Sequence, residues 1–197
     1  MLVANSKLLG LSVLSVQTGA PVGFIADSII DPNTLQIIAF SLSGGLVREA
    51  KYLDTRSIRE YSSLGLIIDN IDELVAPDDV VKLSQILALN FNLLGLKVET
   101  KKGSRLGHVL DFTVSPDNYS ISQIIVKRPF IKSFNDPTLV ISRQEIVEIT
   151  DYKIIVKDEE KTLKSRATKE DFVPNFVNPF REKQPGYVPS DITKEKP

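Results

Sequence analysis

His108 is the only histidine in the chain, so any Ser-His-Asp relay would have to pass through its imidazole. It lies inside a strand-like apolar run, at the position that Phe24 holds in an earlier copy of the same pattern. Because a phenylalanine fills the equivalent place, we favour a structural or surface role for His108 over a catalytic one.

Asp27 and Asp111 also recur at matching positions, and two carboxylates brought together could act as general acid and base. A hydrogen-bonding role at a turn or strand end explains the recurrence better, because a repeated structure repeats its local hydrogen bonds. The chain has no cysteine, no His/Cys metal cluster and no phosphate loop ending in Gly-Lys-Ser/Thr. We therefore expect no catalytic residue, metal ligand or cofactor, and no enzyme activity.

An internal duplication organises the elements that would position these residues. "TGAPVGFIADSIIDPNT" (Thr18–Thr34) recurs about 84 residues later as "KGSRLGHVLDFTVSPDN" (Lys102–Asn118). "LLGLSV" recurs as "LLGLKV", and "SIREYSSLGLIID" as "EIVEITDYKIIVK". We also align "QIIAF" (Gln36–Phe40) with "QIIVK" (Gln123–Lys127), so the spacing between copies varies from about 84 to 88 residues.

Both copies have the pattern of short β-strands. Runs of Val, Ile, Leu and Phe are bounded by Gly, Pro, Asn and Asp. The alternation in "LKVET" places Leu96 and Val98 toward a core and turns Lys97 and Glu99 outward. Strands of this length predict a small, strongly curved sheet or barrel in each copy, which leaves few exposed edges.

One helix is expected between the copies, within residues 76–90. Asp78 or Asp79 would cap its N-terminus. The apolar side chains that would share one face are Val80, Leu83 and Leu87. The sequence therefore predicts a short helix in the linker between the two copies.

The pattern changes after about Asp158, where the chain becomes charged, aperiodic and then rich in proline. Within this segment Phe172, Phe176 and Phe180 recur every four residues. Two interpretations stay open: a disordered tail with incidental aromatics, or an extended segment that docks on a barrel or on a partner.

The overall composition is that of an ordinary soluble protein, with 25% charged and 42% hydrophobic residues. A formal net charge of -1 gives no global field that would recruit nucleic acid or an anionic membrane. No run approaches the roughly 18 apolar residues of a membrane-spanning helix, and Leu8–Val16 fits a first strand better than a signal peptide. We expect a cytoplasmic protein without a membrane span.

At these motifs the chain resembles the PRC-barrel family, small β-barrels named after the photosynthetic reaction-centre H subunit. A related barrel forms the C-terminal domain of the bacterial ribosome maturation factor. The resemblance rests on "LLGLKV", "GSRLGHVLDFTVSPDN", "QIIVK" and "EIVEITDYKIIV", with weaker counterparts in the first copy. It covers about residues 5–70 and 90–157. It implies adaptor modules that dock on proteins, in RNA processing or membrane assemblies, and no shared catalytic residues.

The expected fold is therefore all-β: two tandem small PRC-type β-barrels with a short linking helix and an irregular, proline-rich C-terminal tail. The expected boundaries are residues 1–75 for the first barrel, 76–90 for the linker, 91–157 for the second barrel and 158–197 for the tail. We refer to the two barrel segments as the first copy and the second copy.

Two functions are compatible with this organisation. The first is a non-catalytic adaptor for an unidentified protein partner, and a homodimer is compatible with it. Its candidate partner-binding residues are Arg128, Phe130, Lys132, Phe134, Phe172, Phe176 and Phe180. The alternative is a ribosome- or RNA-associated maturation or processing factor, because basic residues outnumber acidic ones in the second copy. Its candidate RNA contacts are Lys97, Lys101, Lys102 and Arg105, although an ordinary solvated face explains them too.

The outward face of the first strand differs between the copies. Leu14 and Val16 stand where the second copy has Glu99 and Lys101. Apolar side chains of this size stabilise a protein by roughly 1.5–3 kcal/mol each when fully buried. We therefore expect Leu14 and Val16 to be covered by the linker helix, the tail, the second barrel or another subunit.

Overall fold

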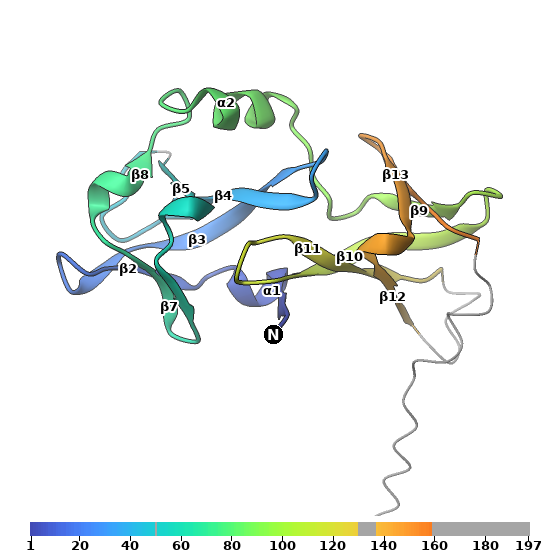
Figure 1. The fold of residues 1–197 in the computed structure, drawn as a ribbon, viewed down its shortest axis with the longest axis horizontal. Coiled ribbons are helices and arrows are strands. Elements are labelled where there is room, and N and C mark those ends of the chain that lie inside the picture. The colour runs from blue at the N-terminus through green and yellow to red at the C-terminus, as the bar shows by residue number, and fades with distance from the viewer. Residues whose placement is uncertain (50, 130–136, 159–197) are drawn as a thin grey trace, which may run out of the picture.

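The computed structural model describes residues 1–49, 51–129 and 137–158. Most of this part of the chain is β-strand, arranged in two curled sheets that lie side by side (Figure 1). The mostly β class predicted from the sequence is confirmed. The first sheet is built from the first copy, and the second sheet mainly from the second copy.

The first sheet has the strand order β6-β7-β2-β3-β4-β5-β8. Its strands are β2 (Ser12–Ser15), β3 (Ala20–Asp31), β4 (Gln36–Ser43), β5 (Lys51–Asp54), β6 (Glu60–Ser62), β7 (Gly65–Ile68) and β8 (Leu74–Val75). Two 3-10 turns complete this copy: η1 (Thr55–Ser57) between β5 and β6, and η2 (Ile71–Glu73) before β8.

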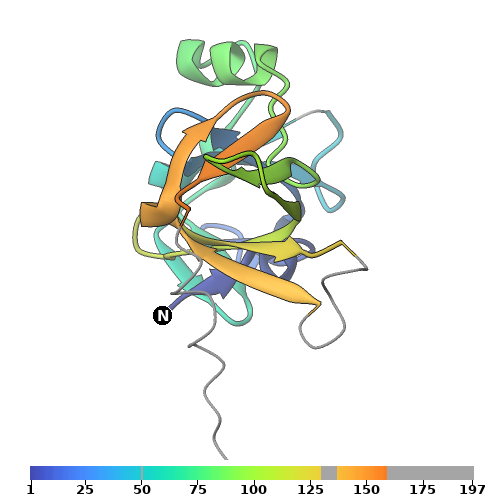
Figure 2. The same ribbon diagram turned by 90° about the vertical axis from the view of Figure 1, so that its right-hand side faces the viewer.

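The second sheet has the strand order β12-β11-β10-β9-β14-β13, and β1 adds to β10 (Figure 2). Its strands are β1 (Val3–Ala4), β9 (Lys97–Thr100), β10 (Arg105–Val114), β11 (Ile121–Lys127), β12 (Thr138–Ser142), β13 (Ile146–Ile149) and β14 (Lys153–Val156). The 3-10 turn η4 (Arg143–Glu145) joins β12 to β13. The chain therefore contributes its first strand to the sheet of the second copy before it builds the sheet of the first.

The two sheets repeat one ladder. β2 pairs in parallel with β7, as β9 does with β14, and the remaining pairs of each ladder are antiparallel. The register shifts between Ile25 and Asp27 in β3, and between Val109 and Asp111 in β10. A bulge is a specific feature of a sheet and not a random defect. Bulges at matching positions therefore agree with the duplication predicted from the sequence.

The register corrects one part of the sequence alignment. Phe24 lies opposite Ser43, and His108 lies opposite Lys127. Ser43 therefore matches Lys127, and the alignment of "QIIAF" with "QIIVK", which matched Phe40 to Lys127, is wrong. An odd-numbered shift along a strand exchanges its two faces. Phe40 is fully buried whereas Lys127 is exposed, so these two residues cannot be equivalent.

The two copies meet through a reciprocal pair of backbone hydrogen bonds. The N–H of Ile37 donates to the carbonyl of Tyr119 (3.0 Å), and the N–H of Ile121 donates to the carbonyl of Leu35 (2.9 Å). Matching residues exchange matching bonds, so the contact has the self-complementary character of a two-fold interface. The rings of Phe40 and Tyr119 pack edge to face across this contact, with their centroids 5.6 Å apart. The buried residues of both copies form one hydrophobic cluster.

The short helix α1 (Asn5–Leu8) ties the start of the chain to both sheets. The hydroxyl of Ser28 on β3 donates to the side-chain oxygen of buried Asn5 (2.7 Å). The N–H of Ser6 donates to the carboxylate of Asp111 on β10 (3.3 Å). Leu8, which we expected in the first strand, ends this helix, and β2 begins only at Ser12.

Helix α2 (Val81–Ala88) lies between β8 and β9 in the chain, above the first sheet in Figure 1. Its N-cap residue is Val80, and no side chain caps it. The predicted cap by Asp78 or Asp79 is therefore wrong, because Asp79 accepts a hydrogen bond from the N–H of Ala76 (2.7 Å) in the preceding turn. The helix buries Leu83 together with Ile86, whereas Leu87 is only half-buried.

Candidate binding surfaces

The four basic residues predicted as RNA contacts lie on one hairpin of the second sheet. Lys97 begins β9 and Arg105 begins β10, and Lys101 and Lys102 form the turn between these strands. All four side chains are exposed. Lys97 and Arg105 both adjoin His108, whereas Lys101 and Lys102 lie at the hairpin tip. The structure therefore divides the predicted set into two pairs.

His108 is held by a hydrogen bond at each ring nitrogen. Its Nδ1 lies 3.1 Å from the carbonyl oxygen of Gly95, and its Nε2 lies 2.7 Å from the guanidinium of Arg105. A carbonyl only accepts and a guanidinium only donates, so these partners assign the proton to Nδ1 and the lone pair to Nε2. Since Arg105 occupies that lone pair, the imidazole is arranged as a structural link and not as a general base.

His108 is also the centre of a line of basic side chains across the second sheet. The register places it opposite Lys97 on β9 and opposite Lys127 on β11, and Lys97 in turn lies beside Lys153 on β14. Residues in register on adjacent strands project from the same face of a sheet. We call this set the basic row: Lys153, Lys97, His108 and Lys127.

The basic row was not predicted as a unit from the sequence. The misaligned "QIIVK" segment matched Lys127 to buried Phe40, which hid its position beside His108. The constant spacing of about 84 residues, extended through this strand, was the signal that places Lys127 correctly.

The equivalent line in the first copy carries no charge. The register aligns Ser12 with Gly65 on β7, and Phe24 with Ser12 and Ser43 on its two sides. We call this set the neutral row: Gly65, Ser12, Phe24 and Ser43. The same four positions of one ladder therefore carry either three lysines and a histidine or no charge at all.

Asp27 and Asp111 are placed alike, one in each sheet. The carboxylate of Asp27 accepts a hydrogen bond from the N–H of Ser28 (2.8 Å), and that of Asp111 accepts one from the N–H of Phe112 (2.8 Å). Both residues stand at the matching bulges of β3 and β10. The structural interpretation of these aspartates is confirmed, because each accepts a matching hydrogen bond from the backbone N–H of the next residue beside its bulge.

The predicted partner-binding residues fall mainly outside the described part of the chain. Arg128 is half-buried directly after β11, and its N–H donates to the carbonyl of Pro137 (3.0 Å). Residues 130–136 and 159–197 are not described. The candidates that lie outside the described residues are Phe130, Lys132, Phe134, Phe172, Phe176 and Phe180.

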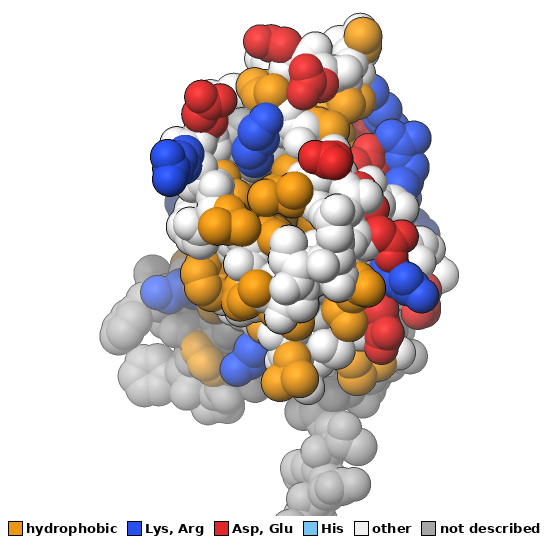
Figure 3. All heavy atoms as spheres, turned by 90° about the vertical axis from the view of Figure 1, so that its left-hand side faces the viewer, with side chains coloured by type: hydrophobic (Ala, Val, Ile, Leu, Met, Phe, Trp, Pro, Cys, Tyr) orange, Lys and Arg blue, Asp and Glu red, His pale blue; other side chains and the backbone are white. Residues whose placement is uncertain are grey.

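The outward face of β2 is only partly covered by the described residues of this chain. Leu96 and Val98 are buried in the second copy, which confirms the inward face of that strand. In the first copy Leu14 is half-buried, but the side chain of Val16 is 56% exposed. Within the described residues of one chain, Val16, which directly follows β2, is therefore not covered, and its cover by the tail or by another subunit stays a prediction. On the side of the molecule that ends in the first sheet, apolar side chains gather over the middle of the face (Figure 3).

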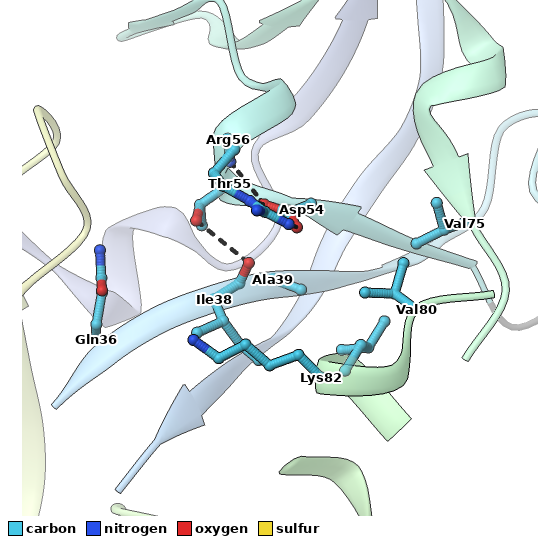
Figure 4. Close-up of a pocket in the computed structure, with 10 residues that line it drawn as sticks. Gln36, Ile38, Ala39, Asp54, Thr55, Arg56, Val75, Val80 and Lys82 are labelled. Atoms are coloured by element: carbon cyan, nitrogen blue, oxygen red, sulfur yellow. Dashed lines mark hydrogen bonds and ion pairs between the residues drawn. The ribbon is translucent and has the colours of Figure 1, made fainter. Parts of the chain in front are cut away.

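A cavity of about 120 Å³ lies between β4, β5, β8 and α2 (Figure 4). The carboxylate of Asp54 accepts from the N–H of Arg56 (2.8 Å) and pairs with its guanidinium (2.6 Å). Burial alone would raise the pKa of the Asp54 carboxyl, but the hydrogen bonds and charge of Arg56 outweigh it and hold that pKa below its ordinary value. Asp54 and Arg56 therefore satisfy each other at the wall of this small cavity.

Within the described ranges, no group of three or more metal-binding side chains could hold an ion. No helix of the same residues is long and apolar enough to cross a membrane. No family model matches the chain, and no curated protein matches its sequence. The binding surfaces must therefore be interpreted from their own chemistry.

Proposed function

We propose that this protein is a non-catalytic cytoplasmic adaptor that binds a protein partner. In this proposal each sheet is a PRC-type β-barrel, and the linker that contains α2 joins the two in tandem. The observation that carries it is the contrast between matching ladders and unlike outer faces, as in the neutral and basic rows. A scaffold that was copied and kept its bulges while its exposed side chains diverged supplies two different surfaces for binding.

The first copy supplies the surface suited to a protein partner. Val16 is 56% exposed, and its position in the second copy is taken by Lys101, so the fold itself does not require an apolar residue there. Exposed apolar groups that gather on one face are typical of interaction sites. Full burial of one such side chain in an interface contributes about 1.5 kcal/mol or more. These features support docking of a partner over the end of β2.

The test is affinity purification with the tagged full chain and two matched variants. Val16→Asp places a charge on the proposed surface. Val81→Asp makes the same change at another exposed valine, the first residue of α2. We expect the wild type and Val81→Asp to retain the same proteins and Val16→Asp to lose them. Equal retention by all three chains, or no partner for the full chain, would contradict the proposal.

Two other segments are tested in the same experiment. A chain that ends at Asp158 removes Phe172, Phe176 and Phe180, and Arg128→Ala alters the residue that follows β11. Loss of the partner from the shortened chain alone would assign recognition to the tail. Loss from Arg128→Ala alone would assign it to the loop after β11.

The second candidate function is a ribosome- or RNA-associated factor. The exposed lysines at the β9–β10 hairpin tip, Lys101 and Lys102, together with neighbouring Lys97 and Arg105, favour it. Phosphate contacts of this kind give an affinity that falls steeply with salt. The test measures RNA binding at rising salt for the wild type and for Lys101→Glu with Lys102→Glu. No binding at low salt, together with no association with ribosomal fractions, would remove this candidate.

A further inference from the structure

We propose that a single-stranded nucleic acid binds across the outer face of the second sheet, along the basic row and over Tyr152 beside it. This inference rests on the RNA-associated candidate function and assigns its contact surface.

The basic row presents its charge to solvent. Lys97 and Lys127 are exposed on either side of half-buried His108, and the guanidinium of Arg105 adds a further charge at the imidazole. Lys153 is 29% exposed and pairs with Glu99 at 3.4 Å. Among the ion pairs of the described residues, neither Lys97 nor Lys127 has a carboxylate partner. The row therefore carries a net positive charge that the neighbouring part of the fold does not neutralise.

The fold does not need this charge. In the first copy the same ladder is complete with Ser12 and Ser43 at the positions of Lys97 and Lys127. Like charges on directly neighbouring strands destabilise a sheet, and Lys97 lies beside Lys153. A row of like charges that one copy carries and the other lacks is best explained by a ligand of opposite charge.

The aromatic groups indicate which anionic ligand fits. Tyr152 directly precedes Lys153, its ring is 65% exposed, and the Lys153 ammonium lies 5.9 Å from the ring centroid. Its counterpart in the first copy is Leu64, which is also exposed but cannot stack in the same way. An exposed aromatic ring beside a line of cations is the combination that binds single strands, because the cations contact phosphates and bases stack on the ring.

The dimensions also favour a flexible strand. Four neighbouring strands place the ends of the basic row roughly 14 Å apart, at about 4.8 Å for each strand spacing. The chain as a whole carries a formal net charge of -1, so attraction is confined to this face. A short local contact of this size suits a few nucleotides of a single strand better than the long backbone of a duplex.

The experiment measures binding of the full chain to a labelled oligouridine of about 12 nucleotides by fluorescence anisotropy, at several salt concentrations. Lys97→Ser with Lys127→Ser transfers the serines of the neutral row, so the ladder should tolerate them. We expect affinity to fall about tenfold or more at low salt. Two lost phosphate contacts should also make the salt dependence shallower by about 1.4 in log–log slope.

Tyr152→Leu transfers the residue of the first copy and tests stacking separately. We expect about a tenfold loss of affinity with an unchanged salt slope, because a base contact is lost and no phosphate contact. Lys7→Ser with Arg48→Ser removes the same charge from exposed positions of the first copy and should change neither quantity. Thermal unfolding of each variant checks that the ladder is intact.

The results distinguish a failure of the proposed site from a failure of the RNA-associated function on which it rests. If the wild type binds no oligonucleotide at low salt, the function and the site fail together. If Lys101→Glu with Lys102→Glu abolishes binding while the serine variant binds normally, the function stands and the basic row is overturned. Equal weakening by the Lys7 and Arg48 control, tighter binding of a duplex, or binding of anionic vesicles alone would also overturn it.

The same measurement with oligodeoxythymidine distinguishes the two sources of a single strand. Equal affinity assigns recognition to phosphate and base stacking, and tighter binding of oligouridine adds contacts with the 2′-hydroxyl. Either result supports the site.

Discussion

In the first copy, the residues in register across β7, β2, β3 and β4 are a glycine, two serines and a phenylalanine. In the second copy, the same positions across β14, β9, β10 and β11 are three lysines and a histidine. The ladders beneath them agree in strand order and in the position of the first bulge. The comparison separates residues that both ladders keep from exposed positions at which the two ladders differ.

Even a glycine at the same position has different surroundings in the two copies. Gly107 has a φ of +149°, and a Cβ there would overlap the carbonyl oxygen of Lys127 on β11. At its counterpart Gly23, an added Cβ would meet the side chain of Val47 at 3.0 Å. The glycine of the second copy is thus required by the backbone, whereas that of the first copy faces a side chain able to shift.

The largest predicted effect tests this difference between the glycines. Gly107→Ala should lower the free energy of unfolding by about 3 kcal/mol, because a methyl group must displace β11 at a φ that alanine disfavours. Gly23→Ala should cost about 1 kcal/mol or less, because only Val47 must move. Urea unfolding of both variants measures the two losses. Equal losses would show that the strands approach one another alike in both copies.

Local patterns explain what the sequence could predict. Alternation identified the inward side chains Leu96, just before β9, and Val98 within it, and the repeated turns indicated a duplication. The equal placement of Asp27 and Asp111 followed from that repetition. Such features depend on a few neighbouring residues, so they can be recognised without knowing the fold.

Long-range choices could not be predicted in this way. β1 pairs with β10, more than a hundred residues away, and no periodicity encodes which of two similar sheets a two-residue strand joins. The predicted cap of α2 was wrong because the carboxylate of Asp79 accepts a hydrogen bond from the N–H of Ala76 instead. The basic row was hidden because a repeated "QII" triplet suggested a register that only the ladder of β10 and β11 can settle.

The next largest effect concerns the contact between the copies. Tyr119 and Leu35 are counterparts with positive φ (55° and 49°), and each accepts one of the two reciprocal backbone bonds. Tyr119→Leu makes the contact symmetric in sequence but removes the aromatic pair with Phe40. We expect a loss of about 1.5 kcal/mol in unfolding free energy, measured at pH 7 in urea. The reverse change, Leu35→Tyr, gains no matching partner, because Phe40 is represented by Ile124 in the second copy.

The loss of unfolding free energy in Tyr119→Leu should also depend on pH, which gives a second test of the same contact. Burial raises the pKa of Tyr119 to about 12, from an ordinary value of 10.0. A group whose pKa is raised by folding contributes stability that is complete below pH 10 and is lost as the pH rises toward 12. The difference between wild type and Tyr119→Leu should therefore narrow above pH 10. A constant difference up to pH 11 would show that the phenol is not buried at the contact.

The smallest predicted loss of unfolding free energy concerns the N-cap of a 3-10 turn. The two turns that follow β5 and β12 differ in this cap. Asp54 caps η1 and pairs with Arg56, whereas Ser142 caps η4 and has Gln144 in place of the arginine. Asp54→Ser keeps a capping side chain but removes the ion pair, whose arginine is 83% exposed. We expect a loss of about 0.5 kcal/mol at pH 7, in the range of exposed pairs.

The sign of the pH effect follows from the lowered pKa of Asp54. Its contribution is complete above the unfolded value of 3.8 and is lost as the pH falls through the lower folded value. The unfolding free energies of wild type and Asp54→Ser should therefore converge as the pH falls below 3.8, as urea unfolding can measure. Ser142→Asp serves as the control, because Gln144 stands at the position of Arg56 and the guanidinium of neighbouring Arg143 donates to the carbonyl of Thr34. With Glu145 already in the same capping box, Ser142→Asp should not stabilise the protein at pH 7. Stabilisation by Ser142→Asp would show that an aspartate stabilises such a turn as a cap alone. The ion pair between Asp54 and Arg56 would then contribute nothing to the unfolding free energy.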